Sequence, residues 1–208
     1  MSIKLGLYDF FAYMIPGSIY ILVLTHLSTI FGWVKADFRL IANLPSLQIL
    51  VLAALAYIVG MVIYPIAERW NGLFKPRGIA KKAYSEFESR YSNFEVRFKP
   101  EHWGLLLAYI RRENFELSAE IERHNVISLM LKNLSFGLSL LAILQIVEFI
   151  RVKFLTVHIA MFMILTFLSI LAIRESAKFK LWFYLSIFDA VAAQSLDSSD
   201  LIAPKRDS

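Results

Sequence analysis

Long apolar intervals alternate with clusters of charge along the chain. No charged residue lies between Asp9 and Lys35, and this interval predicts a membrane span over 10–34. The next interval is densest over 46–67, which predicts a second span. A helix needs about 20 apolar residues to cross the hydrocarbon core, and both intervals are long enough. Residues 1–68 are therefore predicted to form a transmembrane hairpin.

The second half of the chain repeats this pattern. We predict a third span over about 129–150 and a fourth over 154–173, joined by a very short turn. So short a turn requires an antiparallel hairpin, which we place at 126–174. Lys132 lies near one end of the third span, where its long side chain can reach the headgroups.

A polar insertion at 69–125 separates the two hairpins. It begins as a Gly- and Pro-containing loop, followed by a predicted helix at 79–90, a short strand around 94–98 and a further helix after Pro100. A segment of this size rarely builds a stable core alone. We therefore expect the insertion, which is mainly helical, to pack on a second copy or on another protein.

The helix that enters the third span is predicted to be long. Between Glu116 and Phe149 there is neither Gly nor Pro before Gly137, which allows one helix of about 50 Å. Such a helix could carry a cytosolic event into the bilayer. The alternative is a long span with a solvated end.

The C-terminal part is predicted to stay outside the bilayer core. The apolar, aromatic run 181–188 is too short to cross, and Trp182 and Tyr184 stand near lysines. This pattern is typical of an amphipathic helix lying in the interface, which we place at 175–194. The polar residues 195–208 are predicted to form a disordered tail.

Composition and charge support this picture and orient it. The chain is 58% hydrophobic and 19% charged, whereas soluble domains are about 25% charged. We therefore predict an all-α membrane protein with four transmembrane helices. Eighteen of its 22 lysines and arginines fall in the N-terminus, the insertion and the C-terminal part. The positive-inside rule then places both termini in the cytoplasm.

The start of the first span contains candidates for a conformational or gating role. Asp9 stands where the span begins, and Pro16 and Gly17 follow two turns later. Proline frees the carbonyl of Ala12 and bends a helix. A carboxylate beside a broken helix can bind a cation or a proton. Alternatively, Asp9 simply caps the helix N-terminus.

Three further polar residues share one predicted depth. The topology places His26, Glu148 and His158 near the outer edge of the bilayer. Two imidazoles and a carboxylate could bind a divalent metal or relay protons. Equal depth does not make them neighbours, and each could instead face the headgroups.

A basic cluster follows the second span. Its members are Lys75, Arg77, Lys81 and Lys82. Each basic residue near an anionic leaflet contributes about 1 kcal/mol of attraction. We predict contact with anionic lipid, while a nucleotide messenger or RNA remains an alternative ligand.

No motif in the chain indicates catalysis. A Walker A sequence, G-x-G-x-x-G, H-E-x-x-H and G-x-S-x-G are all missing, and there is no cysteine. Arg97 and His102 have the R-x4-H spacing of HEPN ribonucleases, but Phe98 and Pro100 depart from that family's pattern. We therefore predict no enzyme activity, no catalytic residue and no cofactor.

Two pairs of small residues indicate close helix contacts. Ala56 and Gly60 form one small-x-x-x-small pair, and Ser135 and Ser139 form another. Such pairs let helix backbones approach closely in lipid. They fit packing within one chain and self-association equally well.

Two segments resemble parts of a group of bacterial proteins. Tyr8–Gly17, with its acidic residue, aromatics and Ile-Pro-Gly, resembles the start of small uncharacterised bacterial membrane proteins. Ile121–Leu134, with Arg123, Asn125 and Lys132-Asn133-Leu134, is similar to their entry into a third span. Some of these proteins lie in antiphage defence or CRISPR-accessory loci. The resemblance implies a bacterial inner membrane and a role in defence.

These observations favour a non-enzymatic, self-associating membrane protein that acts as a sensor and effector. Its insertion, 69–125, would receive a cytosolic partner or signal, and its helices would alter membrane integrity or regulate the partner. A scaffold that recruits a soluble partner is the alternative. A transporter or membrane enzyme would require the His26–Glu148–His158 group or Asp9 to be functional.

Overall fold

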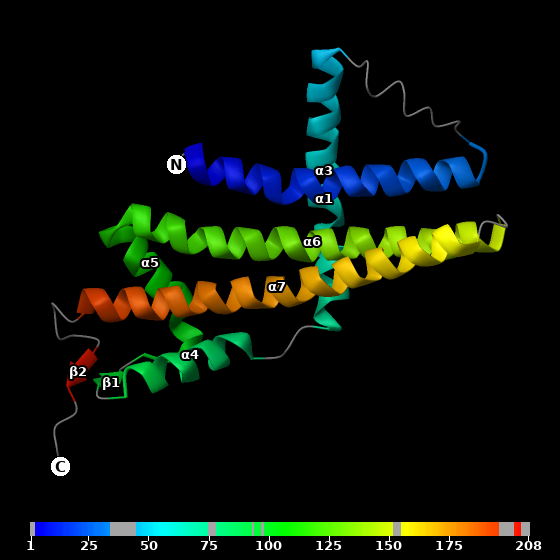
Figure 1. Ribbon diagram of the computed structural model, residues 1–208. Coiled ribbons are helices and arrows are strands. Elements are labelled where there is room, and N and C mark those ends of the chain that lie inside the picture. Colours follow the sequence, from blue (N-terminus) through cyan, green and yellow to red (C-terminus); the bar gives the residue numbers. More distant parts are fainter. Residues whose placement is uncertain are drawn as a thin grey trace. The chain divides into compact units, whose positions relative to one another are not determined.

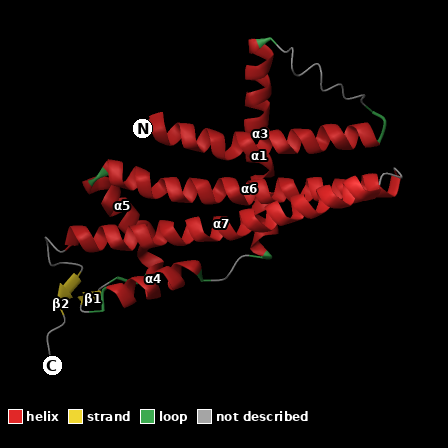
Figure 2. Cartoon of the chain, viewed as in Figure 1, coloured by secondary structure: helices red, strands yellow, loops and turns green. Residues whose placement is uncertain are grey.

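The computed structural model describes residues 3–33, 45–74, 78–92, 94–96, 98–151, 155–195 and 202–204. Helices dominate it (Figures 1 and 2). They are α1 (Ile3–Ile30), α3 (Ser46–Gly72), α4 (Ile79–Arg90), α5 (Trp103–Glu113), α6 (Phe115–Arg151) and α7 (Leu155–Ser195). A 3-10 turn, Pro100–His102, precedes α5.

The predicted class of protein is confirmed at the level of the helices. α1, α3, α6 and α7 are each long and apolar enough to cross a membrane. The single long helix predicted through 116–149 is also confirmed, because α6 has 37 residues and is about 55 Å long. The chain therefore has the helices of a multi-pass membrane protein.

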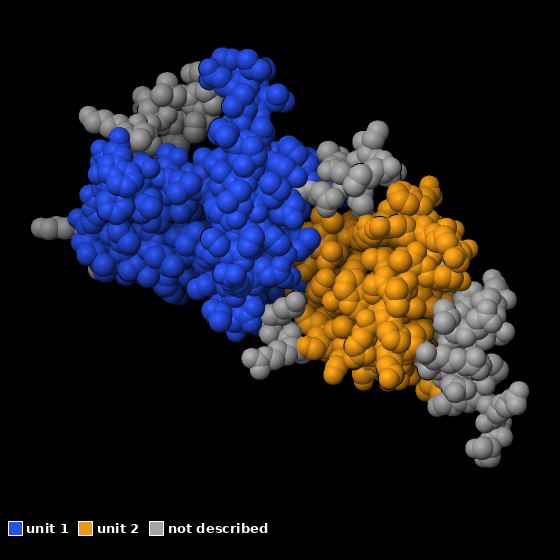
Figure 3. Space-filling model, turned by 180° about the vertical axis from the view of Figure 1, so that it is seen from behind, with its two compact units in different colours: residues 1–75, 129–176 blue, residues 76–128, 177–208 orange. Residues whose placement is uncertain are grey.

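The chain forms two compact units, coloured separately in Figure 3. The first, which we call the span unit, consists of residues 1–75 and 129–176. The second, which we call the insertion unit, consists of residues 76–128 and 177–208. Both α6 and α7 contribute residues to each unit without a break in the helix.

Within the span unit, α1 and α6 run parallel to each other. The hydroxyl of Tyr20 bonds to Asn133, and ten residues further along α1 the carbonyl of Ile30 accepts a hydrogen bond from Arg151. α7 runs antiparallel to α6 and forms with it the predicted hairpin (Figure 1). α1 and the span-unit part of α6 therefore run in the same direction.

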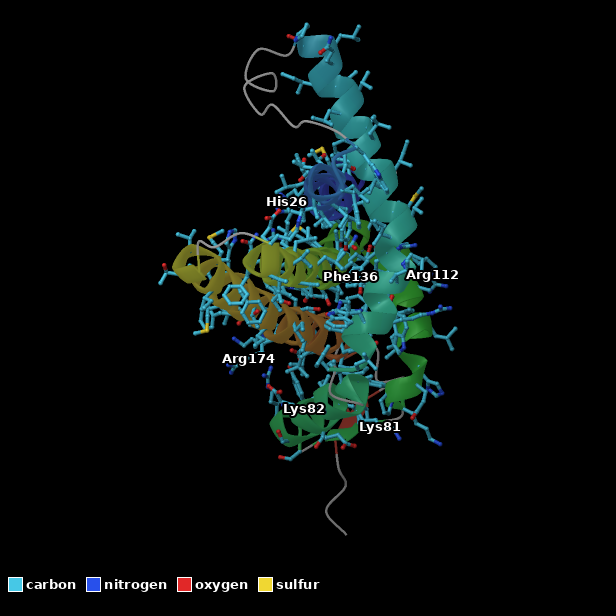
Figure 4. The ribbon with its side chains drawn as sticks, turned by 90° about the vertical axis from the view of Figure 1, so that its right-hand side faces the viewer. His26, Lys81, Lys82, Arg112, Phe136 and Arg174 are labelled. Carbon is cyan, nitrogen blue, oxygen red and sulfur yellow. The ribbon has the colours of Figure 1, made fainter. Side chains whose placement is uncertain are left out.

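α3 lies across these helices instead of alongside them (Figures 1 and 4). Residues 46–52 at its N-terminal end are all exposed. Its buried residues lie further along the helix, namely Ala56, Gly60, Ala67 and Asn71. The contacts of α3 with the rest of the span unit are therefore concentrated in its C-terminal two-thirds.

The insertion unit has its own hydrophobic core, to which α7 contributes. Phe87 of α4, Ile110 of α5 and Ile121 of α6 are buried there. Residues 183–192 of α7 supply most of the remaining buried side chains. The chain's own last helix thus supplies part of this core, and the predicted external partner stays a prediction.

This arrangement differs from the separate interfacial helix that we expected over 175–194. α7 continues unbroken through this range, and Phe183, Ile187 and Phe188 are at most 1% exposed. Trp182 remains partly exposed, whereas Tyr184 packs against the protein core. The charges at 174–180 lie on the surface of a continuing helix and do not end it.

One short strand pair accompanies the helices. β1 (Phe94–Val96) pairs antiparallel with β2 (Ile202–Pro204). β1 lies in the segment 94–98, where alternating apolar and charged residues predict a strand. Part of the tail predicted to be disordered is therefore paired, while 196–201 and 205–208 lie outside the described residues.

Candidate functional site

The backbones of α1 and α3 touch where the two helices cross. A Cβ atom added to Gly17 would overlap the carbonyl oxygen of Ala56, and one added to Gly60 would overlap that of Tyr13. Backbone contact this close requires glycine at both positions. The Ala56–Gly60 pair is therefore used for packing within the chain.

The remaining gating candidates lie on the same stretch of α1. Pro16 is among the fully buried residues, next to Gly17 at the crossing. α1 continues as a helix through Pro16. Asp9 belongs to α1, but its side chain lies outside the described part of the structure. Pro16 and Gly17 are thus packing residues of the crossing.

An ion pair joins α3 to α6 beside this crossing. The ammonium of Lys132 lies 3.0 Å from a carboxylate oxygen of Glu68. The Lys132 side chain is only 7% exposed, whereas that of Glu68 is 47% exposed. Tyr64 donates a hydrogen bond to the other oxygen of Glu68. The expectation that Lys132 reaches the headgroups is wrong, because α3 supplies a counter-charge inside the protein.

Amide side chains extend this polar contact. The amide nitrogen of Asn71 donates to the carbonyl of Lys132 at 2.8 Å, and Ser135 donates to the Asn71 side-chain oxygen at 3.0 Å. Asn133, which is completely buried, donates to the carbonyl of Gly60 at 3.1 Å. α3 and α6 are therefore joined by hydrogen bonds as well as by the ion pair.

Tyr20 brings α1 into the same network. Its hydroxyl lies 2.7 Å from the side-chain oxygen of Asn133 and 2.6 Å from that residue's backbone oxygen. Phe136, labelled in Figure 4, places its ring 6.0 Å from the ring of Tyr20 and 6.0 Å from that of Trp70. We call the set Tyr20, Tyr64, Glu68, Asn71, Lys132, Asn133 and Ser135 the polar junction. It joins three apolar helices through polar side chains.

The second pair of small residues also packs within the chain. Ser139 and Ser169 share a hydrogen bond of 2.8 Å, and Ser169 donates to the carbonyl of Ser135 at 2.9 Å. These bonds connect α6 to α7. Serine hydroxyls commonly link helices in this way where water is excluded.

The predicted three-residue group at the outer edge does not assemble. His26 and Glu148 do meet, with Nε2 3.6 Å from a carboxylate oxygen. His158 instead shares a 3.0 Å hydrogen bond with Gln145. Nowhere in the described ranges do three His, Cys, Asp or Glu residues gather as metal ligands. His158 also lines a cavity of about 180 Å³ between α6 and α7, mostly surrounded by Ile and Phe.

The basic cluster is only partly described. Lys81 and Lys82 are exposed on α4. Lys75, Arg77 and also Arg97, the arginine of the R-x4-H spacing, lie outside the described residues.

Tyr84 of α4 donates a hydrogen bond to the carbonyl of Phe98 at 2.8 Å, and burial raises the pKa of its phenol.

Sequence analysis missed most of the polar junction, although one signal was available. Tyr64, Glu68 and Asn71 are spaced to fall on one face of a helix, at the end of an apolar run. Lys132 and Ser135 have the same kind of spacing on α6. Polar stripes inside predicted spans indicate helix contacts, because isolated polar groups in lipid are costly.

Comparison of the chain with protein-family models, with curated proteins and with solved structures finds no match. The polar junction must therefore be interpreted from its own chemistry.

Proposed function

We propose that this chain is a non-enzymatic sensor and effector of the bacterial inner membrane, with both termini in the cytoplasm. A partner or signal acts on the insertion unit, and the span unit responds by changing membrane integrity or the activity of the partner. The setting is a bacterial defence system. The polar junction, above all the Glu68–Lys132 ion pair, is the observation on which this proposal rests.

Burying a charged side chain inside a membrane protein costs free energy. Ionisable residues within spans are costly and usually mark functional positions. Lys132 is almost fully buried and, within the described residues, pairs with one carboxylate that is itself half exposed. This pairing stabilises its charge while α3 holds Glu68 in place. An ion pair of this kind favours one arrangement of α3 against α6 and disfavours others.

α6 gives a route by which the insertion unit could influence this ion pair. Lys132 stands on the same unbroken helix as residues 115–128 of the insertion unit. A shift or rotation of that helix would move Lys132 relative to Glu68. Loss of the pair would leave a buried ammonium without a counter-charge, which favours rearrangement or the entry of water.

The defence setting rests on the resemblance of Tyr8–Gly17 and Ile121–Leu134 to proteins of such loci. In this chain the two segments supply Pro16 and Gly17 at the helix crossing and Lys132 and Asn133 at the polar junction. The resemblance thus falls on residues that hold the three helices together. Self-association is part of the proposal, because helices that perturb a membrane commonly act as assemblies.

Membrane potential in bacteria under phage challenge tests this function. Cells expressing the chain are compared with cells carrying an empty vector and with cells expressing Pro16→Ala. We expect protection accompanied by depolarisation, which Pro16→Ala weakens. Neither protection nor depolarisation, despite confirmed insertion, would contradict the defence role.

A membrane scaffold is the second candidate function. The backbone contact at Gly17 and Gly60 favours it, because such a contact makes a rigid joint. A rigid joint would display the insertion unit to a soluble partner without opening anything. Protection with an unchanged membrane potential in the same experiment would select the scaffold.

A further inference from the structure

Lys81 and Lys82 are the unpaired cations of α4. Both side chains are exposed, and neither forms an ion pair or hydrogen bond within the part of the chain that the structure describes. Three arginines of the insertion unit behave differently. Arg90 pairs with Glu86, Arg111 with Glu122 and Arg112 with Glu113, and these residues lie on α4, α5 and α6.

Charge is distributed unevenly along α4. The lysines stand in its first turn, whereas Glu86 and Glu88 lie in its second half. The opposite face, with Ile79, Ala83 and Phe87, is buried. Figure 4 shows both lysines on this helix. The first turn of α4 is therefore its basic end, whereas its second half carries both acidic residues and Arg90.

The lysines do not stabilise the helix that carries them. The N-terminus of a helix is the positive end of its dipole, where basic side chains are unfavourable. Gly78, which precedes α4, offers no side chain to cap it. The placement of two lysines here is thus explained better by an external anion than by the stability of α4.

The position of α4 in the chain indicates which anion this is. Only residues 73–78 separate α4 from the end of α3, one of the four helices able to cross a membrane. A bilayer surface is therefore near this basic end whenever α3 is inserted. A soluble anion normally needs a concave site with several converging donors. Two lysines on a convex helix surface suit an extended charged surface.

We propose that Lys81 and Lys82 are a contact site for the headgroups of anionic lipids. The contact holds the basic end of α4 at the membrane surface next to the end of α3. It requires α3 to be inserted in a bilayer and does not depend on the proposed defence role.

A fluorescent label on α4 tests this contact in the full-length chain. The protein has no cysteine, so Ser85→Cys gives a single labelling site one turn after Lys81, on an exposed position. The variant carries an environment-sensitive dye and is reconstituted into vesicles of phosphatidylcholine, alone or mixed with phosphatidylglycerol. We expect a blue shift that requires phosphatidylglycerol and is lost in about 1 M salt, where the Debye length is ~3 Å.

Two charge-matched variants decide whether the lysines cause the shift. The Lys81→Gln/Lys82→Gln variant should lose most of the blue shift, because each lysine removed weakens the association of α4 with the anionic surface about fivefold. The Lys99→Gln/Arg112→Gln variant removes two positive charges elsewhere on the insertion unit and should keep the blue shift. The proposed lipid contact would be contradicted if neutral vesicles gave the same blue shift as anionic ones, or if both variants lost the shift equally. A shift produced only by added RNA or polyphosphate would also contradict it, and would assign the lysines to a soluble anion.

Discussion

At the scale of single residues, the smallest side chains determine how closely the helices of the span unit approach. Gly17 and Gly60 bring the backbones of α1 and α3 into contact, and Asn133 bonds to the Gly60 carbonyl from α6. Weak Cα–H···O contacts commonly accompany such crossings. Gly60 therefore contacts two other helices at one point.

Replacing Gly60 by alanine should separate these helices. The added methyl group would overlap the carbonyl of Tyr13, and relief requires movement of backbone instead of a side chain. We expect a loss of about 1–3 kcal/mol in the free energy of unfolding, measured by thermal or denaturant unfolding in detergent. Gly104→Ala is the matched control, because nothing lies within 4 Å of a Cβ there. The control should be neutral or stabilised by about 0.5 kcal/mol. Equal effects of the two substitutions would contradict the crossing.

The sequence could predict some of these residues but not their partners. The spacing of Ala56 and Gly60 indicates a close contact, yet it cannot say whether the contact is internal. The position of Lys132 near a span boundary fits both a headgroup contact and a buried pair. Hydropathy along one helix indicates only how deep Lys132 lies. Whether it contacts headgroups or forms a buried pair depends on Glu68, which stands 64 residues away on α3.

At the scale of elements, α7 differs most from expectation. It contains 41 residues and is about 61 Å long, twice the ~30 Å of a hydrocarbon core. The sequence contains the reason, because no Gly or Pro occurs between 155 and 195. Charges at 174–180 end the apolar part of this helix, but they do not end the helix itself. Its last third then packs in the core of the insertion unit.

Truncating a buried residue of α7 should destabilise α4 as well. Ile187 is completely buried in the core that contains Phe87, and Ile187→Ala should cost about 2–5 kcal/mol. Hydrogen exchange of residues 79–90 measures the effect directly. Leu105→Ala removes a side chain that is 74% exposed and should leave this exchange unchanged. If α7 lay on the membrane surface instead, neither substitution would change the exchange of α4.

At the scale of the whole molecule, the parallel packing of α1 and α6 limits the possible topologies. If both helices cross the bilayer, they cross it in the same direction, and the distribution of Lys and Arg predicts that they enter from the cytoplasm. In the proposed orientation the antiparallel α7 then returns to the cytoplasm. The proposed topology, with both termini inside, requires α3 to return the chain across the bilayer between α1 and α6, although α3 lies across these helices in the span unit.

Reporter fusions test this topology. A fluorescent protein fused after Ser208 should be bright, and a phosphatase that is active only in the periplasm should be inactive there. A phosphatase fused after Leu40, between α1 and α3, should be active. Phosphatase activity at the C-terminus would place that end outside and reverse the proposed orientation.

The most direct measurement of the central claim is the resting membrane potential of cells expressing variants of the Glu68–Lys132 pair. Glu68→Gln leaves the buried Lys132 without a counter-charge, whereas Glu68→Gln/Lys132→Met removes both charges. Equal membrane insertion of all three proteins is confirmed first. We predict depolarisation without phage challenge in the single variant and a normal resting potential in the wild type and the double variant. If the single variant were as polarised as the double variant, the ion pair would not control the response of the span unit.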